Sequence, residues 1–175
     1  MLPERLVGAR LVLRKARPDD LDAIYENVWS RAELARTMFW DVTTTHDEAV
    51  ARLERTMAYQ AQNDAYFVCL RRTDEPIGFA GVREYAPGAW EETGICIARA
   101  QQGQGYGKEV LALLTKAAFG AGGRRFVYGC FRSNVRSAAV CRALGFRYAY
   151  NTVLRHRRDG RPVLVDFYTL PRETP

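Results

Sequence analysis

The sequence contains little histidine and little cysteine. Its two histidines, His46 and His156, are far apart, and none of its four cysteines forms a C-x-x-C pair. A structural zinc site needs clustered nitrogen or sulfur ligands, and a Ser-His-Asp hydrolase needs a histidine beside its serine. We therefore expect no metal site and disfavour that hydrolase class. Reduced, mostly buried thiols are expected at all four positions: Cys69, Cys96, Cys130 and Cys141.

Long hydrophobic runs are also missing. No stretch of about 18 apolar residues occurs, so we expect no membrane span. The opening residues, Met-Leu-Pro-Glu-Arg, do not form the apolar core of a signal peptide, so we expect a cytoplasmic protein. The chain has 175 residues, 47% of them hydrophobic and 26% charged, and shows no repeat, low-complexity stretch or linker. These features predict a single globular domain over residues 1–175.

A glycine-rich stretch, residues 101–110, is the most informative part of the sequence. It holds three glycines at alternate positions, Gly103, Gly105 and Gly107. A β-like run over residues 93–99 precedes it. A helical apolar stripe follows it, at Val110, Leu113, Leu114, Ala117 and Ala118. A glycine-rich turn that opens a helix directs free N–H groups and the positive end of the helix dipole at one point. This pattern predicts an anion cradle that suits a pyrophosphate.

The glycine spacing distinguishes between known cradles. A dinucleotide fold uses G-x-G-x-x-G at the start of a βαβ unit, whereas these glycines follow G-x-G-x-G late in the chain. A P-loop needs Ser or Thr after its lysine, whereas Lys108 precedes Glu109. What remains, Gln102-x-x-Gly105-x-Gly107 directly after a strand, resembles the acetyl-coenzyme A signature of the GNAT superfamily of N-acetyltransferases. A glycine-rich helix start without a ligand is the alternative at this point.

Hydrophobic periodicity and turn signals predict the order of the elements. Four helices are expected, beginning near Pro18, at a Thr45–Glu48 capping box, near Tyr106 and at Asn134 or Ser133. Residues 30–45 have no clear period, and their Met38-Phe39-Trp40 cluster fits either a pocket lining or plain core. Seven strands are expected, at residues 11–15, 66–70, 77–82, 92–99, 125–130, 147–156 and 162–170.

A second motif strengthens the GNAT resemblance. The run Asn134-x-x-Ser137-x-x-x-Cys141-x-x-x-Gly145-Phe146 is similar to the second cofactor segment of the family. The tail over residues 155–170 resembles the branch of ribosomal-protein-alanine acetyltransferases (RimL-like), and the whole resemblance covers residues 8–170. It implies the GNAT α/β (α+β) fold: a mixed, mostly antiparallel seven-stranded sheet, flanked by about four helices and splayed between its fourth and fifth strands.

The resemblance implies that acetyl-CoA is the co-substrate and that no metal is needed. The pantetheine arm would pair with the backbone of Ile97, Ala98 and Arg99 in the fourth strand. Asn134, Ser137 and Cys141 are spaced to share one helix face and would touch the pantetheine and thioester, although Asn134 and Ser137 also suit a helix cap. The pyrophosphate would be held by the loop N–H groups of Gln102, Gly103, Gln104, Gly105, Tyr106, Gly107 and Lys108.

The implied reaction is direct attack of an amine on the acetyl thioester. Glu92, at the expected start of the fourth strand, is the leading general base, with Glu91 and Glu84 as rivals and a solvated charge as the alternative. The Ile97 N–H would polarise the thioester carbonyl. Many GNAT enzymes carry a tyrosine as general acid where this chain has Cys141, so Ser137, Cys141, a tyrosine from elsewhere or water would protonate the thiolate.

The sequence leaves the acetyl acceptor open. A protein N-terminus, a small amine or amino acid and an aminoglycoside-like antibiotic are candidates, and the pocket is expected between residues 29–45 and the final hairpin. A net charge of +6 favours anionic partners, but the arginines are spread out, so nucleic acid is disfavoured. Arginines near the final hairpin favour an acidic or peptide acceptor: Arg155, Arg157, Arg158 and Arg161.

Two further questions stay open at this level. A coenzyme A-binding or regulatory module without catalysis is the alternative function, since the same motifs would bind the cofactor in both cases. The oligomeric state is either a monomer or a homodimer.

Overall fold

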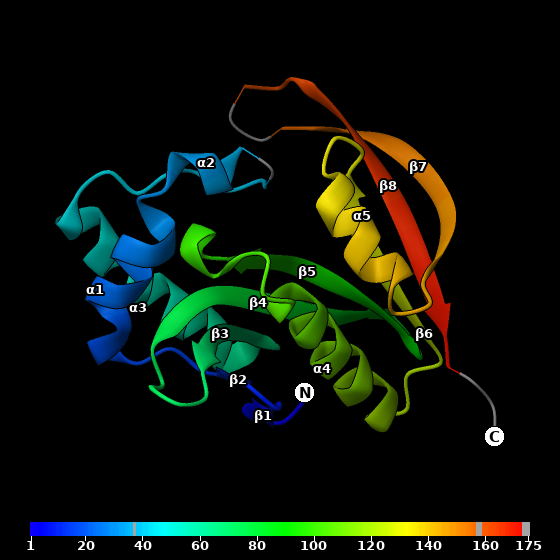
Figure 1. Cartoon of the computed structure of the whole chain (residues 1–175), viewed down its shortest axis with the longest axis horizontal. Coiled ribbons are helices and arrows are strands. Elements are labelled where there is room, and N and C mark those ends of the chain that lie inside the picture. Colours follow the sequence, from blue (N-terminus) through cyan, green and yellow to red (C-terminus); the bar gives the residue numbers. More distant parts are fainter. Residues whose placement is uncertain (37, 157–158, 173–175) are drawn as a thin grey trace.

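The computed structural model describes residues 1–36, 38–156 and 159–172. Its strands form one eight-stranded sheet in the order β1-β2-β3-β4-β5-β6-β8-β7 (Figure 1). All neighbouring strands are antiparallel except β5 and β6, which are parallel. The strand bounds are β1 Arg5–Val7, β2 Leu11–Arg14, β3 Ala65–Leu70, β4 Pro76–Ala86, β5 Ala89–Ile97, β6 Arg125–Phe131, β7 Arg147–Arg155 and β8 Pro162–Pro171.

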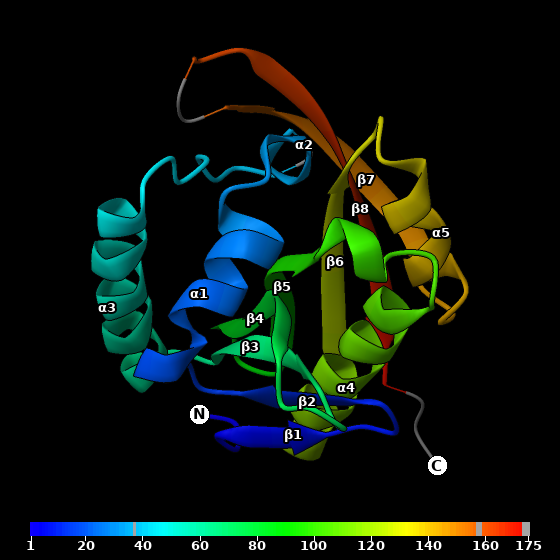
Figure 2. The same ribbon diagram turned by 60° about the vertical axis from the view of Figure 1, so that its left-hand side comes forward.

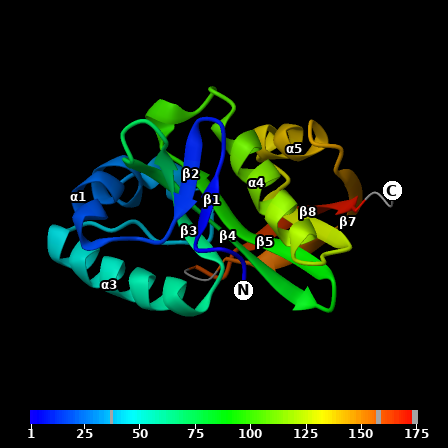
Figure 3. The same ribbon diagram turned by 90° about the horizontal axis from the view of Figure 1, so that it is seen from below.

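Helices cover both faces of this sheet. Figures 2 and 3 show α1 and α3 on one face and α4 and α5 on the other. The first helix begins as a 3-10 turn, Pro18–Asp20, and continues beyond α1 as a π-helical segment, Tyr25–Trp29. The α-helix bounds are α1 Leu21–Ile24, α2 Ala32–Ala35, α3 His46–Gln62, α4 Tyr106–Gly120 and α5 Val135–Arg142. None of the helices in the described part of the chain combines the length and apolar character that crossing a membrane requires.

The seven expected strands are all present, and so is the mixed, mostly antiparallel sheet. The structure adds β1, which pairs with β2 and has only Leu6 buried. It also adds the one-turn helix α2 in the segment without clear periodicity. Both are shorter than the window over which a hydrophobic period can be recognised. The local predictions of a Thr45–Glu48 capping box and a left-handed cap at Gly145 (φ 85°) are confirmed.

The splay between β5 and β6 is the feature that positions the site. These strands pair only at Ala89–Arg125, Trp90–Phe126 and Glu91–Val127, and within the described residues they continue without pairing to Ile97 and Phe131. On its other side β5 follows β4, but the register shifts between Gly81 and Val82, so that Thr93 has no partner on β4. Such a bulge bends a strand, and here it lies where β5 leaves β6.

The core lies between the sheet and its helices. The largest fully buried side chains include Trp29, Tyr66, Phe67 and Phe126. On α4 the completely buried positions are Val110, Leu111, Leu114 and Ala118, while the predicted Leu113 and Ala117 are only partly buried. The four cysteines are free and buried, as the sequence predicted.

Gly78 should be essential to the contact between β4 and β5. A Cβ built at Gly78 would lie 2.1 Å from the backbone oxygen of Cys96, which cannot move without disturbing the strand. We therefore expect Gly78→Ala to lower the free energy of unfolding by about 2–3 kcal/mol, measured by denaturant titration. Gly120→Ala is the control, because nothing lies within 4 Å of its Cβ, and it should change stability by less than about 1 kcal/mol. Equal effects would contradict the close approach.

Candidate active site

A cavity of about 2460 Å³ occupies the gap between β5 and β6. Its walls come from both faces of the sheet. On one face they include the start of α4 and α5, and on the other they include α3 and the segment after α2. The cavity therefore joins the predicted anion cradle to the predicted acceptor pocket. The predicted site residues that line it are Ile97, Arg99, Gln102, Gly103, Gly105, Tyr106, Gly107, Lys108, Glu92, Asn134 and Ser137.

The glycine loop has the geometry of an anion cradle. Gly105 is the N-cap of α4 in a left-handed conformation (φ 79°) and offers no capping side chain. The first hydrogen bond of the helix runs from the Glu109 N–H to the Gly105 oxygen, over 3.2 Å. The N–H groups of Tyr106, Gly107 and Lys108 thus have no partner among the described residues. Space remains above them, since a Cβ at Gly107 would meet nothing within 4 Å.

An ion pair that joins distant parts of the chain supports this loop. The Glu109 carboxylate accepts hydrogen bonds from the Arg10 and Leu11 backbone N–H groups at 2.8 and 3.1 Å and pairs with the Arg10 guanidinium at 2.9 Å. Arg10 in turn donates to the Gln104 oxygen and lies over the Tyr106 ring, 4.6 Å from its centroid. Burial would raise the pKa of Glu109, but these hydrogen bonds lower it overall.

The glutamine of the motif has a structural partner. Gln102 Nε2 donates to the Ile97 oxygen over 3.0 Å, which ties the loop back to the end of β5. Gln104 bonds to Gln101 through its side chain and does not line the cavity. In the described structure, the donors of this loop that remain available to an anion are therefore backbone N–H groups rather than these bonded amides.

Backbone hydrogen bonding distinguishes Ile97 from Ala98. Along an antiparallel pair, residues alternate between those bonded to the partner strand and those pointing away from it. The Ala98 N–H donates to the Ile77 oxygen over 2.7 Å, and its oxygen accepts from the Gln101 N–H over 2.9 Å. Ile97, paired with Gly78, therefore directs its N–H away from β4 and toward the gap. The prediction that Ala98 offers its backbone to the pantetheine is wrong, because both groups are already bonded.

Glu92 lies in the middle of β5, where the strand leaves β6, and not at the strand's start as predicted. Its Oε1 accepts from the Gly129 N–H on β6 over 3.3 Å. Burial raises the pKa of Glu92 to about 7, and hydrogen bonds from the Gly129 and Gly94 backbones oppose this rise. A carboxyl group with this pKa exists in both protonation states near neutral pH, which suits general acid–base chemistry.

The two rival carboxylates are engaged elsewhere. Glu91 Oε1 accepts from Arg83 Nε over 2.6 Å, in an ion pair across β4 and β5. Glu84 Oε1 accepts from the Gly88 N–H in the turn that follows, over 2.7 Å.

On α5, one of the three predicted residues is out of reach. Asn134 caps the helix by accepting from the Ser137 N–H over 3.2 Å. Ser137 Oγ lies 2.5 Å from the Tyr128 hydroxyl of β6, and both residues line the cavity. Cys141 is fully buried, bonds to the Ala138 oxygen and does not line the cavity, because the helix turns it toward the core. This position contradicts a direct role for Cys141.

Tyr128 is a site residue that the sequence analysis did not name. It lies in the mostly buried strand β6, where an aromatic side chain usually packs in the core. Its position next to α5 depends on the tertiary fold. Burial, followed by the charge of nearby Glu92, raises the pKa of Tyr128 above its usual value. Its hydroxyl therefore stays protonated at neutral pH.

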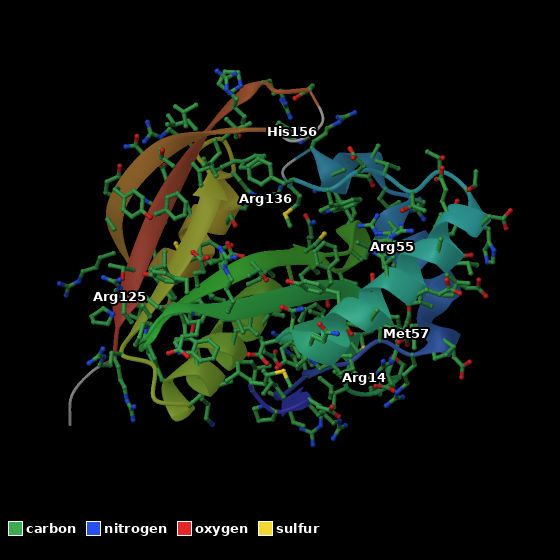
Figure 4. All side chains as sticks on the ribbon, turned by 180° about the vertical axis from the view of Figure 1, so that it is seen from behind. Arg14, Arg55, Met57, Arg125, Arg136 and His156 are labelled. Atoms are coloured by element: carbon green, nitrogen blue, oxygen red, sulfur yellow. The ribbon has the colours of Figure 1, made fainter. Side chains whose placement is uncertain are left out.

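The cavity extends between residues 29–45 and the final hairpin, where the sequence analysis places the acceptor pocket. Trp29, Met38, Phe39 and Trp40 line one wall, and Leu154, Arg155, Val165 and Phe167 come from β7 and β8. Phe39 packs against His156, which Figure 4 labels at the end of β7, with ring centroids 5.8 Å apart. Of the predicted hairpin arginines, Arg161 pairs with Asp159, while Arg157 and Arg158 lie outside the described residues.

Comparison with known proteins decides the family. The model of the acetyltransferase (GNAT) domain matches residues 10–147, which is most of the chain and includes the glycine loop and the Asn134–Phe146 segment. The chain belongs to the GNAT acetyltransferase family. Its family reaction is acetyl transfer. No curated protein matches the sequence.

Solved structures agree on the fold. A GNAT-family acetyltransferase from Bacillus anthracis is 18% identical with a TM-score of 0.83, covering 97% of this chain and 99% of that one. A Salmonella typhimurium acetyltransferase that modifies the N-terminal serine of a 50S ribosomal protein is 23% identical with a TM-score of 0.75, over 95% and 97%. The microcin C7 self-immunity acetyltransferase, in complex with acetyl-CoA and AMP, is 17% identical with a TM-score of 0.79, over 94% and 93%. At these identities the likeness concerns the GNAT fold, which the RimL-like structure from Salmonella typhimurium shares with the other two.

The raised pKa of Glu92 should make stability depend on pH. The value is about 7 in the folded protein against 4.5 for an ordinary glutamate, so between these values the folded protein holds a proton that the unfolded chain has lost. The free energy of unfolding therefore falls as pH rises from about 4.5 to about 7. We expect Glu92→Gln to gain about 1–3 kcal/mol relative to wild type between pH 5 and pH 8, measured by denaturant titration.

The control for this experiment is Glu54→Gln, which removes an exposed carboxylate from α3. It should follow the wild-type pH trend. If Glu92→Gln followed that trend as well, the Glu92 carboxyl would titrate like an ordinary surface group.

Proposed function

We propose that this protein transfers the acetyl group of acetyl-CoA to a primary amine, by direct attack while both substrates are bound. The carrying observation is the position of Glu92. It lies at the divergence of β5 and β6, in a cavity that reaches both the anion cradle and the wall formed by α3. A carboxyl group with a pKa of about 7 stands where an amine from one face would meet a thioester from the other.

The residues present fit acetyl-CoA as the co-substrate. The unpartnered N–H groups at the start of α4 would bind its pyrophosphate, and Lys108 and Arg99 would add positive charge at the same cavity wall. The backbone of Ile97 faces the gap and would pair with the pantetheine as a neighbouring strand does, its oxygen accepting a second hydrogen bond besides the one from Gln102 Nε2. Its N–H is also the donor available to polarise the thioester carbonyl.

Glu92 would take the proton that the attacking amine must lose, directly or through a water molecule. As the new N–C bond forms and the C–S bond breaks, negative charge develops on the leaving sulfur. The Tyr128 hydroxyl, held by Ser137, would donate its proton to that sulfur. At neutral pH the Tyr128 hydroxyl is protonated before the reaction, so it has a proton to donate. Ser137 would then position the acid, and Cys141 would have no part in the reaction.

Replacing Glu92 tests the base. We expect Glu92→Gln to lower kcat by about 100-fold or more, since a positioned base contributes roughly 10² to 10⁴. In wild type, kcat should rise with pH through about 7 as Glu92 loses its proton, and this rise should be absent in the variant. Turnover is measured as thiol release with a panel of amines. Binding is measured as the thermal unfolding midpoint, which acetyl-CoA should raise in the variant as much as in wild type. Unchanged kcat and pH profile would exclude Glu92 as the base.

Replacing Tyr128 tests the acid. Tyr128→Phe keeps the ring and removes only the hydroxyl, so we expect kcat to fall about 10-fold or more while the KM for acetyl-CoA changes little. Cys141→Ala, on the same helix as Ser137, is the control. Its kcat should stay within about twofold of wild type because the thiol does not line the cavity. The assignment fails if Cys141→Ala loses activity and Tyr128→Phe keeps it.

A further inference from the structure

Arg52 is a partly buried cation with no carboxylate partner. It projects from α3 and lies between two indole rings, with its guanidinium 4.7 Å from the Trp29 ring centroid and 5.0 Å from that of Trp40. None of the ion pairs among the described residues includes it. Burial and then the neighbouring Arg55 lower the pKa of Arg52 to about 10, and the charge of Asp41 opposes this fall only in part.

Only one end of the Arg52 guanidinium is bonded. Nη1 donates to the Asp41 oxygen at 3.0 Å and to Thr43 Oγ1 at 2.8 Å, which uses both of its hydrogens. Nε and Nη2 make no hydrogen bond within the described chain. These two nitrogens form the edge whose parallel N–H groups match the two oxygens of a carboxylate. The Nη1 hydrogen bonds hold the 41–43 loop, but they do not account for the Nε and Nη2 edge.

The surroundings of this edge also favour an anion. Arg52 lines the acceptor side of the cavity together with Arg55, one turn further along α3 (Figure 4), which makes no hydrogen bond or ion pair with a described residue. The buried Nε1 of Trp40 has no partner among the described residues either. The carboxylate of Glu48, four residues before Arg52 on the helix, is held by hydrogen bonds from Thr44 and Thr45. Donors without acceptors therefore gather on this wall.

We propose that the acetyl acceptor carries a carboxylate besides its amine, and that the Nε and Nη2 edge of Arg52 binds this carboxylate. The inference rests on the proposed acetyl transfer and narrows its substrate class. With the carboxylate on α3 and the amine in the gap beside Glu92, the acceptor spans the α3 side of the cavity. The contacts with the two indole rings and the two Nη1 hydrogen bonds already restrict the guanidinium, so binding the acceptor needs little further ordering of the arginine.

This substrate class has two sources that share the chemistry. One is a peptide with a free N-terminus and an acidic side chain close to it, and the other is a free amino acid. An aminoglycoside-like polyamine offers no carboxylate, and its positive charges would be repelled by Arg52 and Arg55. The inference thus disfavours a polyamine acceptor, in the same direction as the sequence argument from the hairpin arginines.

Matched acceptor pairs test the inference. Each pair has the same amine with and without the carboxylate: Ser-Asp-amide against Ser-Asn-amide, and free glutamate against its diamide. We expect wild type to favour the acidic member of at least one pair by about tenfold or more in kcat/KM. The pair that shows the preference identifies the source of the carboxylate. Equal values for both members of both pairs would overturn the inference while leaving acetyl transfer intact.

Variants then assign the preference to Arg52. Arg52→Gln should reduce the acidic preference to about twofold or less, and Arg52→Lys should lose most of it, because lysine keeps the charge but not the fork. Loosening of the 41–43 loop would weaken both members of a pair equally, so the ratio isolates carboxylate binding. Arg72→Gln, in the exposed turn after β3, removes the same charge and should keep the wild-type ratio. An unchanged ratio in Arg52→Gln would also overturn the inference.

A binding measurement separates failure of this inference from failure of the proposed function. The same pairs are titrated by calorimetry into the protein with coenzyme A, where no turnover is possible. Tighter binding of the acidic member without any acetylation would support the carboxylate site and count against the transferase proposal. If neither acidic compound binds at millimolar concentration, the carboxylate site is rejected whatever the activity.

Discussion

The structure depends on one interruption in its hydrogen bonding. β5 and β6 share three paired positions and then separate, so the later half of β5 keeps a row of backbone groups directed at open space. Unpaired backbone groups in a protein interior are costly, which is why strands rarely part in the middle of a sheet. The bulge opposite Gly81 and the close contact at Gly78 hold β5 on β4 while it leaves β6. A molecule that supplies the missing partner strand removes this cost.

The same gap sets the electrostatics of the site. Glu92 lies at the point where the two strands separate. The surrounding residues desolvate its carboxyl group, and the side chain still lines the cavity. Tyr128 faces the gap from β6, and its raised pKa follows from the same enclosed surroundings and from Glu92 itself. A carboxyl group that ionises near neutral pH and a hydroxyl that does not are thus produced by one local environment, which suits the opposite roles that we propose for them in proton transfer.

The sequence predicted the parts of the fold that are encoded locally. Strand alternation, the Thr45–Glu48 capping box and the glycine loop each depend on neighbouring residues, and each is present. What it did not predict depends on contacts between distant segments. The Arg10–Glu109 ion pair joins the first strands to α4, and the Tyr128–Ser137 contact joins β6 to α5. Helical spacing alone placed Cys141 beside Ser137, but the packing of α5 turned its thiol into the core.

The Glu109 carboxylate couples the N-terminal edge of the sheet to the glycine loop. It holds the first turn of α4 against the backbone of Arg10 and Leu11, next to the start of the sheet's outer strands. Fraying of that sheet edge would break the hydrogen bonds to the Glu109 carboxylate. The N–H groups at the start of α4 would then no longer be held pointing at one position. By thermodynamic linkage, an anion bound at the cradle must in turn suppress the fraying. The N-terminal strands, whose described residues do not line the cavity, would therefore contribute to the affinity for such an anion.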